Sequence, residues 1–182
     1  MEQDYRVEKI LYTQEFIENK IKEVAQWINE TYKDSKDLVL VGLLKGSILF
    51  LAQLIKSVKV DHTIDFIVAS SYYGTSKSTG TIKIVTDLAH DIKGKDVLII
   101  EDIVDSGITI VKVIEYLKTK QPTSIRVASL LNKSAKRKVE FTPDKIGIEV
   151  PDLFLIGYGL DYQEKFRNLP YIGILKKEFI KD

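Results

Sequence analysis

Apolar residues recur at helical spacing in three segments of the chain. From Thr13 to Tyr32 they stand three or four positions apart, at Phe16, Ile17, Ile21, Val24, Ala25 and Ile28. The same spacing returns from Ser47 to Ser57, and again from Gly107 to about Lys120, shortly before a proline. Because this spacing places the apolar side chains on one face, we predict three amphipathic helices.

Short apolar runs alternate with these helices. They lie at Leu38–Leu44, Ile64–Ser71, Thr81–Thr86, Asp96–Ile100 and Ser124–Leu131. Runs that are apolar throughout are typical of strands buried on both faces. Strands that alternate with helices predict an α/β fold, in which a central parallel sheet carries helices on both faces. The tail from residue 146 to residue 179 holds shorter strands and turns, and we expect a small lobe within one domain spanning residues 1–182.

Composition excludes several kinds of protein. The 182 residues suffice for one domain with a sizeable core. A formal net charge of +1 argues against non-specific binding to nucleic acid or membranes. The chain has no cysteine, which removes disulfides, thiolate nucleophiles and cysteine-bound zinc. Since the charged N-terminus lacks a signal-peptide pattern and no apolar run is long enough to span a bilayer, we expect a cytoplasmic protein.

The most informative segment runs from Val97 to Thr109. An apolar strand leads into two carboxylates, Glu101 and Asp102, and an Asp-Ser-Gly turn then opens a helix. In open α/β sheets, ligands bind beyond the carboxyl ends of the strands. Unpaired N–H groups at a helix N-terminus favour phosphate, and glycine lets the anion approach closely. The segment therefore predicts a phosphate site beside carboxylates that hold a sugar diol, directly or through Mg²⁺.

The same segment also fits an ordinary structural interpretation. Asp, Ser and Thr are common at helix N-caps, and acidic residues that follow a strand often lie in a solvated loop. The residues by themselves leave both interpretations open.

The strand, the acidic pair and the Asp-Ser-Gly turn with its following Thr resemble a known motif. It is the site for 5-phosphoribosyl-1-pyrophosphate (PRPP) in type I phosphoribosyltransferases. Three more motifs match in order, at Val41–Ser47, around Ser71 and Tyr72, and at Pro151–Tyr162 with Phe166 and Arg167. The chain is thereby similar, over nearly its full length, to the 6-oxopurine branch of that family and especially to its bacterial hypoxanthine-guanine members.

This resemblance implies a fold and an activity. The fold is a central parallel sheet with helices on both faces, plus a hood lobe formed by the N-terminal residues and roughly residues 146–182. The activity is purine salvage, the Mg²⁺-dependent transfer of phosphoribosyl from PRPP to hypoxanthine or guanine. The products are IMP or GMP and pyrophosphate. A homodimer or homotetramer is the usual assembly of the family.

By the resemblance, the central motif binds the sugar phosphate. Glu101 and Asp102 hold the ribose hydroxyls and form the magnesium site with Asp161. The residues implied for PRPP and its 5′-phosphate are Asp105, Ser106, Gly107, Ile108 and Thr109. Asp105 also lies under the purine imidazole ring, as the family's usual candidate for the catalytic base at N7. A carboxylate there takes a proton and favours positive charge on the ribosyl centre.

The residues implied for pyrophosphate come from three segments and are Lys45, Gly46, Ser71, Tyr72 and Arg167. The first two lie in a strand-to-helix turn, where the family often has a cis peptide bond, here Leu44–Lys45. The next two begin a loop that resembles one that closes over the reacting centre and excludes water. The guanidinium of Arg167 is well shaped to pair with pyrophosphate.

The residues implied for the purine are Lys133, Phe154, Leu155 and Asp161. Phe154 stacks on the base, and Leu155 offers backbone contacts to its edge. The Lys133 ammonium donates but cannot accept, so it favours a 6-oxo over a 6-amino purine. Without the resemblance, we would read Phe154 as a core aromatic and Lys133 as part of a solvated basic run. Asn132 departs from the Asp of many relatives, which alters how Lys133 is held.

Two other functions compete with this interpretation. A PRPP-sensing regulator of the same fold that binds nucleic acid would keep the motif without the catalysis. The complete set of acidic residues and the near-neutral charge weigh against it. A kinase-like nucleotide-binding protein is excluded because the chain has no G-x-x-x-x-G-K-[ST] loop.

Overall fold

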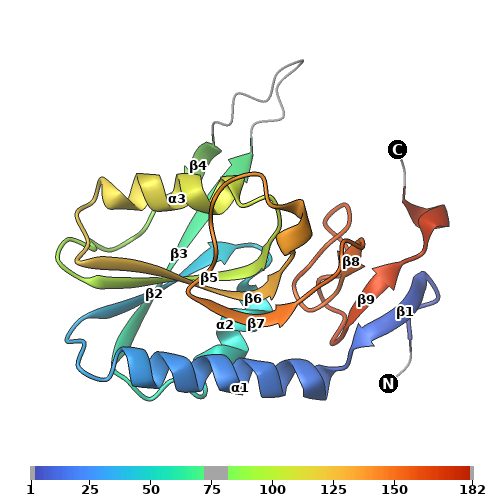
Figure 1. The fold of residues 1–182 in the computed structure, drawn as a ribbon, viewed down its shortest axis with the longest axis horizontal. Helices are drawn as coiled ribbons and strands as arrows, with labels where there is room; N and C mark the ends of the chain where they lie inside the picture. Colours follow the sequence, from blue (N-terminus) through green and yellow to red (C-terminus); the bar gives the residue numbers. More distant parts are fainter. Residues whose placement is uncertain (1–2, 72–81, 181–182) are drawn as a thin grey trace.

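The computed structural model describes residues 3–71 and 82–180. A six-stranded sheet forms its centre, in the order β4-β3-β2-β5-β6-β7 (Figure 1). The strands are β2 (Leu38–Leu44), β3 (His62–Ser71), β4 (Ile82–Thr86), β5 (Asp96–Val104), β6 (Ser124–Asn132) and β7 (Lys145–Glu149). Neighbouring strands are parallel except β4, which runs antiparallel to β3. The predicted parallel sheet is therefore confirmed.

Helices cover both faces of this sheet, as the sequence predicted. Figure 1 shows α1 (Gln14–Thr31) and α2 (Ile48–Leu54) on one face and α3 (Ile108–Lys118) on the other. Alternate strand residues divide between the two layers, since Leu40 packs in the cluster with α1 and α2 while Val41 packs with α3. Both side chains are fully buried, which explains why this strand is apolar throughout.

α1 begins at its capping residue Thr13, whose hydroxyl accepts a hydrogen bond from the Phe16 N–H at 3.3 Å. The buried face holds Ile17, Ile21, Val24, Ala25 and Ile28, as predicted. Phe16 was predicted on the same face but is 41% exposed, and its ring stacks on Tyr12 with centroids 5.4 Å apart. Within the described residues, no helix is long and apolar enough to cross a membrane.

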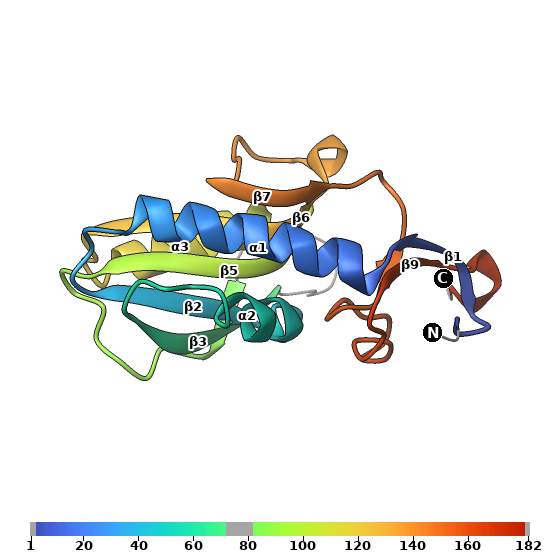
Figure 2. The ribbon, with the colours of Figure 1, turned by 90° about the horizontal axis from the view of Figure 1, so that it is seen from below.

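A second, antiparallel sheet forms a lobe at one end of the molecule, where both termini lie (Figure 2). Its strands and the 3₁₀ helix that follows are β1 (Val7–Tyr12), β8 (Leu155–Ile156), β9 (Ile172–Leu175) and η2 (Lys177–Phe179). Leu155 and Ile172 share a core cluster with α1, so the lobe packs against the central body. The sequence placed this lobe from about residue 146. Residues 145–149 instead pair with β6 as the edge strand of the central sheet, so the lobe's C-terminal part starts later.

Strand β5 is longer than the sequence indicated. We expected it to end at Ile100, but it continues to Val104 because Glu101, Ile103 and Val104 pair with β6. Successive residues of a strand point to opposite faces. Glu101 and Asp102 therefore face opposite sides of the sheet, and each belongs to a different part of the site.

Candidate active site

The largest hollow of the site lies between the carboxyl end of the central sheet and the hood lobe. It is a cavity of about 520 Å³. Its lining comes from β5 and the turn after it, from the segment after β6 and from residues 152–161: Asp102, Ile103, Asp105, Lys133, Lys136, Asp152, Leu153, Phe154, Leu155, Leu160 and Asp161. Six of these had been predicted for the purine, the base catalyst or the metal, and one of the six, Asp102, also for the ribose. The fold therefore brings together residues up to 59 positions apart in sequence (Asp102 to Asp161).

A smaller cavity of about 120 Å³ lies at the N-terminus of α3. It shares Asp105 and Ile103 with the first cavity and adds the residues predicted for the 5′-phosphate, Ser106, Gly107 and Thr109, together with Glu101. Gly107 caps the helix at a φ of 81°, a left-handed conformation that favours glycine. This arrangement, a cavity at a helix N-terminus with a carboxylate on its wall, suits an anion that carries hydroxyl groups.

The two adjacent carboxylates have unusual surroundings. Burial raises the pKa of Glu101 well above its usual range, and the nearby Asp102 carboxylate raises it further. Its Oε2 atom is buried and has no hydrogen-bond partner in the described structure. Burial likewise raises the pKa of Asp102 to about 6, although the Arg167 charge opposes that rise. Buried acids with raised pKa values disfavour the folded state at neutral pH, which is typical of residues kept for function.

We expect Asp102→Asn to stabilise the metal-free protein at pH 7.5, by about 1–3 kcal/mol in the free energy of unfolding. The folded-state pKa exceeds the unfolded one, so the carboxylate begins to cost stability above pH 3.8, and the cost is complete above about pH 6. The gain should shrink as the pH falls below that value and become small near pH 4, where the folded state holds the proton and the unfolded state, with a pKa of 3.8, holds it about half the time. Urea unfolding at both pH values measures this, with the exposed Asp34→Asn as the control. A gain independent of pH would contradict the assignment.

The turn after β2, strand β5 and the hood lie in close contact near Asp102. The predicted cis peptide bond is present between Leu44 and Lys45. A Cβ atom added to Gly46 would lie 1.8 Å from Asp102 Oδ2, and one added to Gly159 would lie 2.0 Å from the Gly46 carbonyl oxygen. Only glycine fits at these two positions, so the turn after β2 packs directly on β5 and on the hood.

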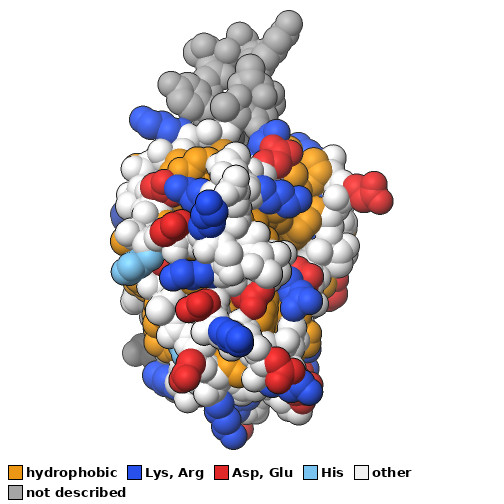
Figure 3. Space-filling view, turned by 90° about the vertical axis from the view of Figure 1, so that its left-hand side faces the viewer, with side chains coloured by type: hydrophobic (Ala, Val, Ile, Leu, Met, Phe, Trp, Pro, Cys, Tyr) orange, Lys and Arg blue, Asp and Glu red, His pale blue; other side chains and the backbone are white. Residues whose placement is uncertain are grey.

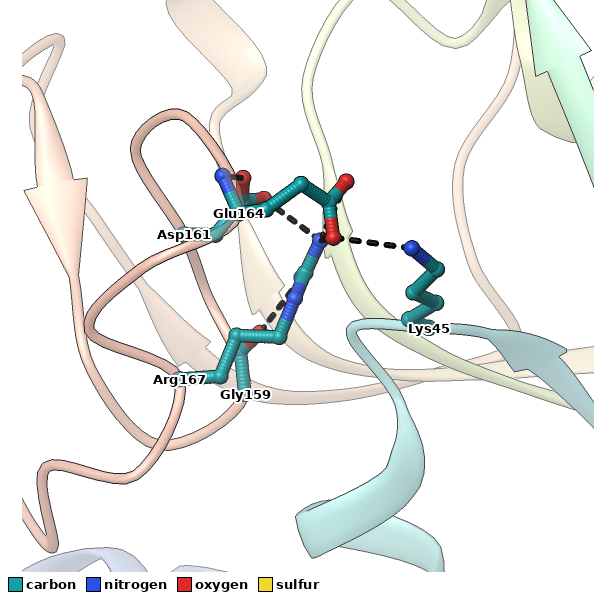
Figure 4. A network of polar contacts seen from close by, with 5 residues as sticks. All are labelled: Lys45, Gly159, Asp161, Glu164 and Arg167. Carbon is teal, nitrogen blue, oxygen red and sulfur yellow. Dashed lines mark hydrogen bonds and ion pairs between the residues drawn. The ribbon is translucent and has the colours of Figure 1, made fainter.

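An ion pair connects this turn to the hood, and further polar contacts join the hood residues to one another (Figure 4). Arg167 donates to the Gly159 carbonyl at 2.8 Å and pairs with Asp161 at 2.9 Å. Lys45 pairs with Glu164 at 2.8 Å, and Glu164 also lies 3.5 Å from Arg167. The hydrogen bond from Lys45 lowers the pKa of Glu164. The two cations predicted for pyrophosphate thus share one carboxylate, which the sequence analysis did not single out.

Lys133 is buried, although it begins a basic run that usually indicates a solvated surface. Its Nζ atom donates to the Leu153 carbonyl at 3.0 Å and lies 3.9 Å from Asp105 Oδ2. Phe154 lies on the cavity wall, 42% exposed, with its ring edge-on to Tyr162 at 5.4 Å. The ammonium, the carboxylate and an open aromatic face therefore border the same space, which suits a flat polar ring.

The two residues predicted in the loop after β3 stand where the described part of the chain ends. The Ser71 backbone pairs with Ile82 in β3 and β4, and Tyr72 lies outside the described residues. The sequence analysis also missed Arg137, which donates to the Asp105 carbonyl at 3.0 Å. Its position in a lysine-rich run gave no signal, because the contact depends on how β5 and β6 pair.

The chain is similar over most of its length to known proteins. The family described as "Phosphoribosyl transferase domain" matches residues 8–163. A hypoxanthine-guanine phosphoribosyltransferase of Staphylococcus epidermidis is 46% identical over 94% of this chain and 96% of its own. A hypoxanthine phosphoribosyltransferase of Escherichia coli is 49% identical over 86% and 89%. The structure of the Trypanosoma cruzi hypoxanthine phosphoribosyltransferase in complex with the product IMP has a TM-score of 0.92 at 38% identity, covering 99% of this chain and 100% of that one.

Proposed function

This chain belongs to the phosphoribosyltransferase family, in its hypoxanthine-guanine branch, and from that premise we propose that it transfers phosphoribosyl from PRPP to a 6-oxopurine. It has the type I phosphoribosyltransferase fold. Hypoxanthine and guanine give IMP and GMP, with pyrophosphate as the second product. The observation that carries the proposal is the pair of cavities that meet at Asp105. One suits a sugar phosphate, and the other suits a flat base with an oxo group.

Binding places the two substrates on either side of Asp105. The N–H groups and hydroxyls at the start of α3 receive the 5′-phosphate, and Glu101 beside them accepts from the ribose hydroxyls. Lys45 and Arg167 attract the pyrophosphate group. The base enters the larger cavity against Phe154, with its 6-oxo group toward Lys133. The exposed carboxylate of Asp105 and the buried ammonium of Lys133 therefore flank the base.

The chemistry requires little more than proton handling and charge stabilisation. The purine N9 atom attacks C1′ as the bond from C1′ to the pyrophosphate oxygen breaks. The ring gains nucleophilic character by losing its N7 proton, which Asp105 accepts. Positive charge that develops on the ribosyl centre is favoured by the carboxylates around it, and the cations opposite stabilise the leaving pyrophosphate.

The site suits a Mg²⁺ ion that binds together with the phosphate groups of the substrate. No group of three or more His, Cys, Asp or Glu side chains suited to a metal occurs in residues 3–71 and 82–180. Mg²⁺ commonly uses one or two carboxylates plus substrate phosphates, so a preformed cage is not required. We propose that Asp161 and Asp102, which line the larger cavity, would hold it. Glu101, which the sequence analysis placed in the same metal site, faces the opposite side of the sheet, and its unpartnered Oε2 is left for the ribose hydroxyls. When bound, the ion would neutralise pyrophosphate charge.

A spectrophotometric assay with PRPP and Mg²⁺ against hypoxanthine, guanine, xanthine and adenine tests the proposal. We expect turnover of at least one 6-oxopurine and far slower turnover of adenine. PRPP binding without turnover of any base would favour the alternative, a PRPP-sensing regulator. Figure 3 weighs against that alternative, since acidic and basic side chains are interspersed on the face that it displays. A nucleic-acid surface is usually basic over a whole patch.

Glu164 is expected to compete with pyrophosphate for its two cations. In Glu164→Gln we expect KM for PRPP to fall about 2- to 5-fold at low salt, because Lys45 and Arg167 lose an anionic partner. The carboxylate is exposed, so the effect should shrink at high ionic strength. Steady-state kinetics at two salt concentrations measure it, with exposed Glu178→Gln as the control. A rise in KM would show that Glu164 instead orients the cations for binding.

We also propose a homodimer or homotetramer, which the family resemblance supports and light scattering after size-exclusion chromatography tests. A cytoplasmic location is proposed as well, because phosphorylated substrates are retained on one side of a membrane. Fractionation of cells that express a tagged chain checks the location.

We further propose that the central body and the hood form one domain, because residues of both belong to one core cluster.

A further inference from the structure

The loop of residues 105–107, which follows β5 and lines the cavity predicted for the 5′-phosphate, is called the anion loop here. Three successive carbonyl groups at its start accept hydrogen bonds that hold it in place. The Val104 carbonyl accepts from the Lys133 N–H at 3.0 Å, and the Ser106 carbonyl accepts from the Lys138 N–H at 2.9 Å. Between them, the Asp105 carbonyl accepts from Arg137 Nη1 at 3.0 Å. All three donors belong to the segment that follows β6 and contains the 3₁₀ helix η1 (Ser134–Lys136). One side of the loop is therefore fully occupied by this segment.

These three contacts decide where the loop points its N–H groups. In a trans peptide, the carbonyl of one residue and the N–H of the next point in opposite directions. With the carbonyls of residues 104–106 turned toward the η1 segment, the N–H groups of residues 105–107 face away from it. The cavity predicted for the 5′-phosphate is lined by Asp105, Ser106 and Gly107. The orientation of the loop amides toward the anion thus depends on what holds the carbonyls.

Arg137 supplies the one side-chain donor among the three. Its guanidinium also donates to Asn132 Oδ1. Asn132 is 2% exposed and is itself fixed by a 2.7 Å hydrogen bond from its Nδ2 atom to Glu149. The stem of Arg137 packs over the loop, since a Cβ added to Gly107 would lie 2.9 Å from Arg137 Cδ. Both Nη atoms of the guanidinium therefore donate hydrogen bonds, one to the Asp105 carbonyl and one to Asn132 of β6. Glu149 of β7 in turn fixes Asn132.

We propose that Arg137 is a positioning residue that sets the orientation of the Asp105–Ser106 peptide. Through that peptide it turns the Ser106 N–H toward the phosphate and holds the Asp105 side chain in place between the two cavities. The inference rests on the proposed function, because the phosphate is the 5′-phosphate of PRPP or of the nucleotide product. A guanidinium suits the task because it reaches two acceptors in one plane, which an ammonium does not.

The test is the affinity of the purified full chain for two anions, IMP and pyrophosphate, measured by calorimetry. We expect Arg137→Met to weaken IMP binding about tenfold and to leave pyrophosphate binding within about twofold. Arg137→Lys keeps the charge but loses the two-pronged contact, and it should recover less than half of the loss in binding energy. Lys118→Met, which removes a distant exposed charge, is expected to bind both anions as the wild type does.

Three outcomes would overturn the proposal. They are unchanged IMP affinity in Arg137→Met, an equal loss for both anions, or full recovery in Arg137→Lys. The last two would indicate general damage to the fold or simple charge attraction. If Arg137→Met does not fold, as judged by circular dichroism, Arg137→Lys alone decides, since wild-type IMP affinity in it would refute the positioning role. A wild-type chain without PRPP-dependent turnover would instead refute the proposed function, which keeps the two failures separate.

Discussion

Asp105→Asn is expected to lower kcat by about 10²- to 10⁴-fold while the affinity for PRPP changes only a few-fold. The carboxylate stands where the two cavities meet, 3.9 Å from the Lys133 ammonium. Asn has nearly the same shape but cannot accept the purine N7 proton. The backbone of residue 105, which Arg137 holds through its carbonyl, remains available to the phosphate. The change therefore removes the chemistry and leaves the binding loop in place.

Pre-steady-state turnover with hypoxanthine measures this loss, because product release then cannot hide it. PRPP affinity is measured separately by calorimetry in the presence of Mg²⁺. Asp34→Asn, an exposed residue beyond the end of α1, is the matched control and should behave as the wild type. Equal single-turnover rates in Asp105→Asn and the wild type would remove the proton-accepting role. A large loss of PRPP affinity would mean that the Asp105 side chain mainly binds PRPP and does not act as the proton acceptor.

The central sheet was predictable because its signal is local. A strand such as Leu38–Leu44, buried on both faces, must be apolar throughout, and this pattern needs no knowledge of its neighbours. The end of β5 was predicted too early because Glu101 and Asp102 interrupt the apolar run, although their backbone still pairs with β6. Burial of two acids within a strand is unfavourable, so the pattern that marks the strand fails at the site.

Contacts between distant segments account for what the sequence did not reveal. The hood strand β1 pairs with β9, so Val7 lies opposite Leu175, and no local pattern indicates such a pairing. Glu164 and Arg137 matter through their partners, Lys45 and the Asp105 carbonyl, which lie 119 and 32 positions away. The resemblance to the family supplied Lys133, but only the structure buries it beside the cavity.

Replacement of Lys133 is expected to have the second large effect, which is on the binding of the purine base. In Lys133→Met we expect KM for hypoxanthine to rise about 10- to 150-fold, the range that follows from losing a hydrogen bond with a charged donor. Met keeps the length of the stem in a buried site and adds no polar atom. The expected loss is specific to the base, since the stem and the 5′-phosphate loop lie in different cavities. KM for PRPP should change little.

Lys133→Gln tests whether Lys133 also disfavours a 6-amino purine. An ammonium can only donate, whereas an amide both donates and accepts, so Gln can receive a hydrogen bond from the 6-amino group of adenine. We therefore expect the ratio of kcat/KM for hypoxanthine to that for adenine to fall more in Lys133→Gln than in Lys133→Met. The exposed Lys93→Met serves as the control for loss of charge. An unchanged ratio in both variants would show that another group reads the 6-position, and the Leu153 carbonyl would then be the main partner of this ammonium.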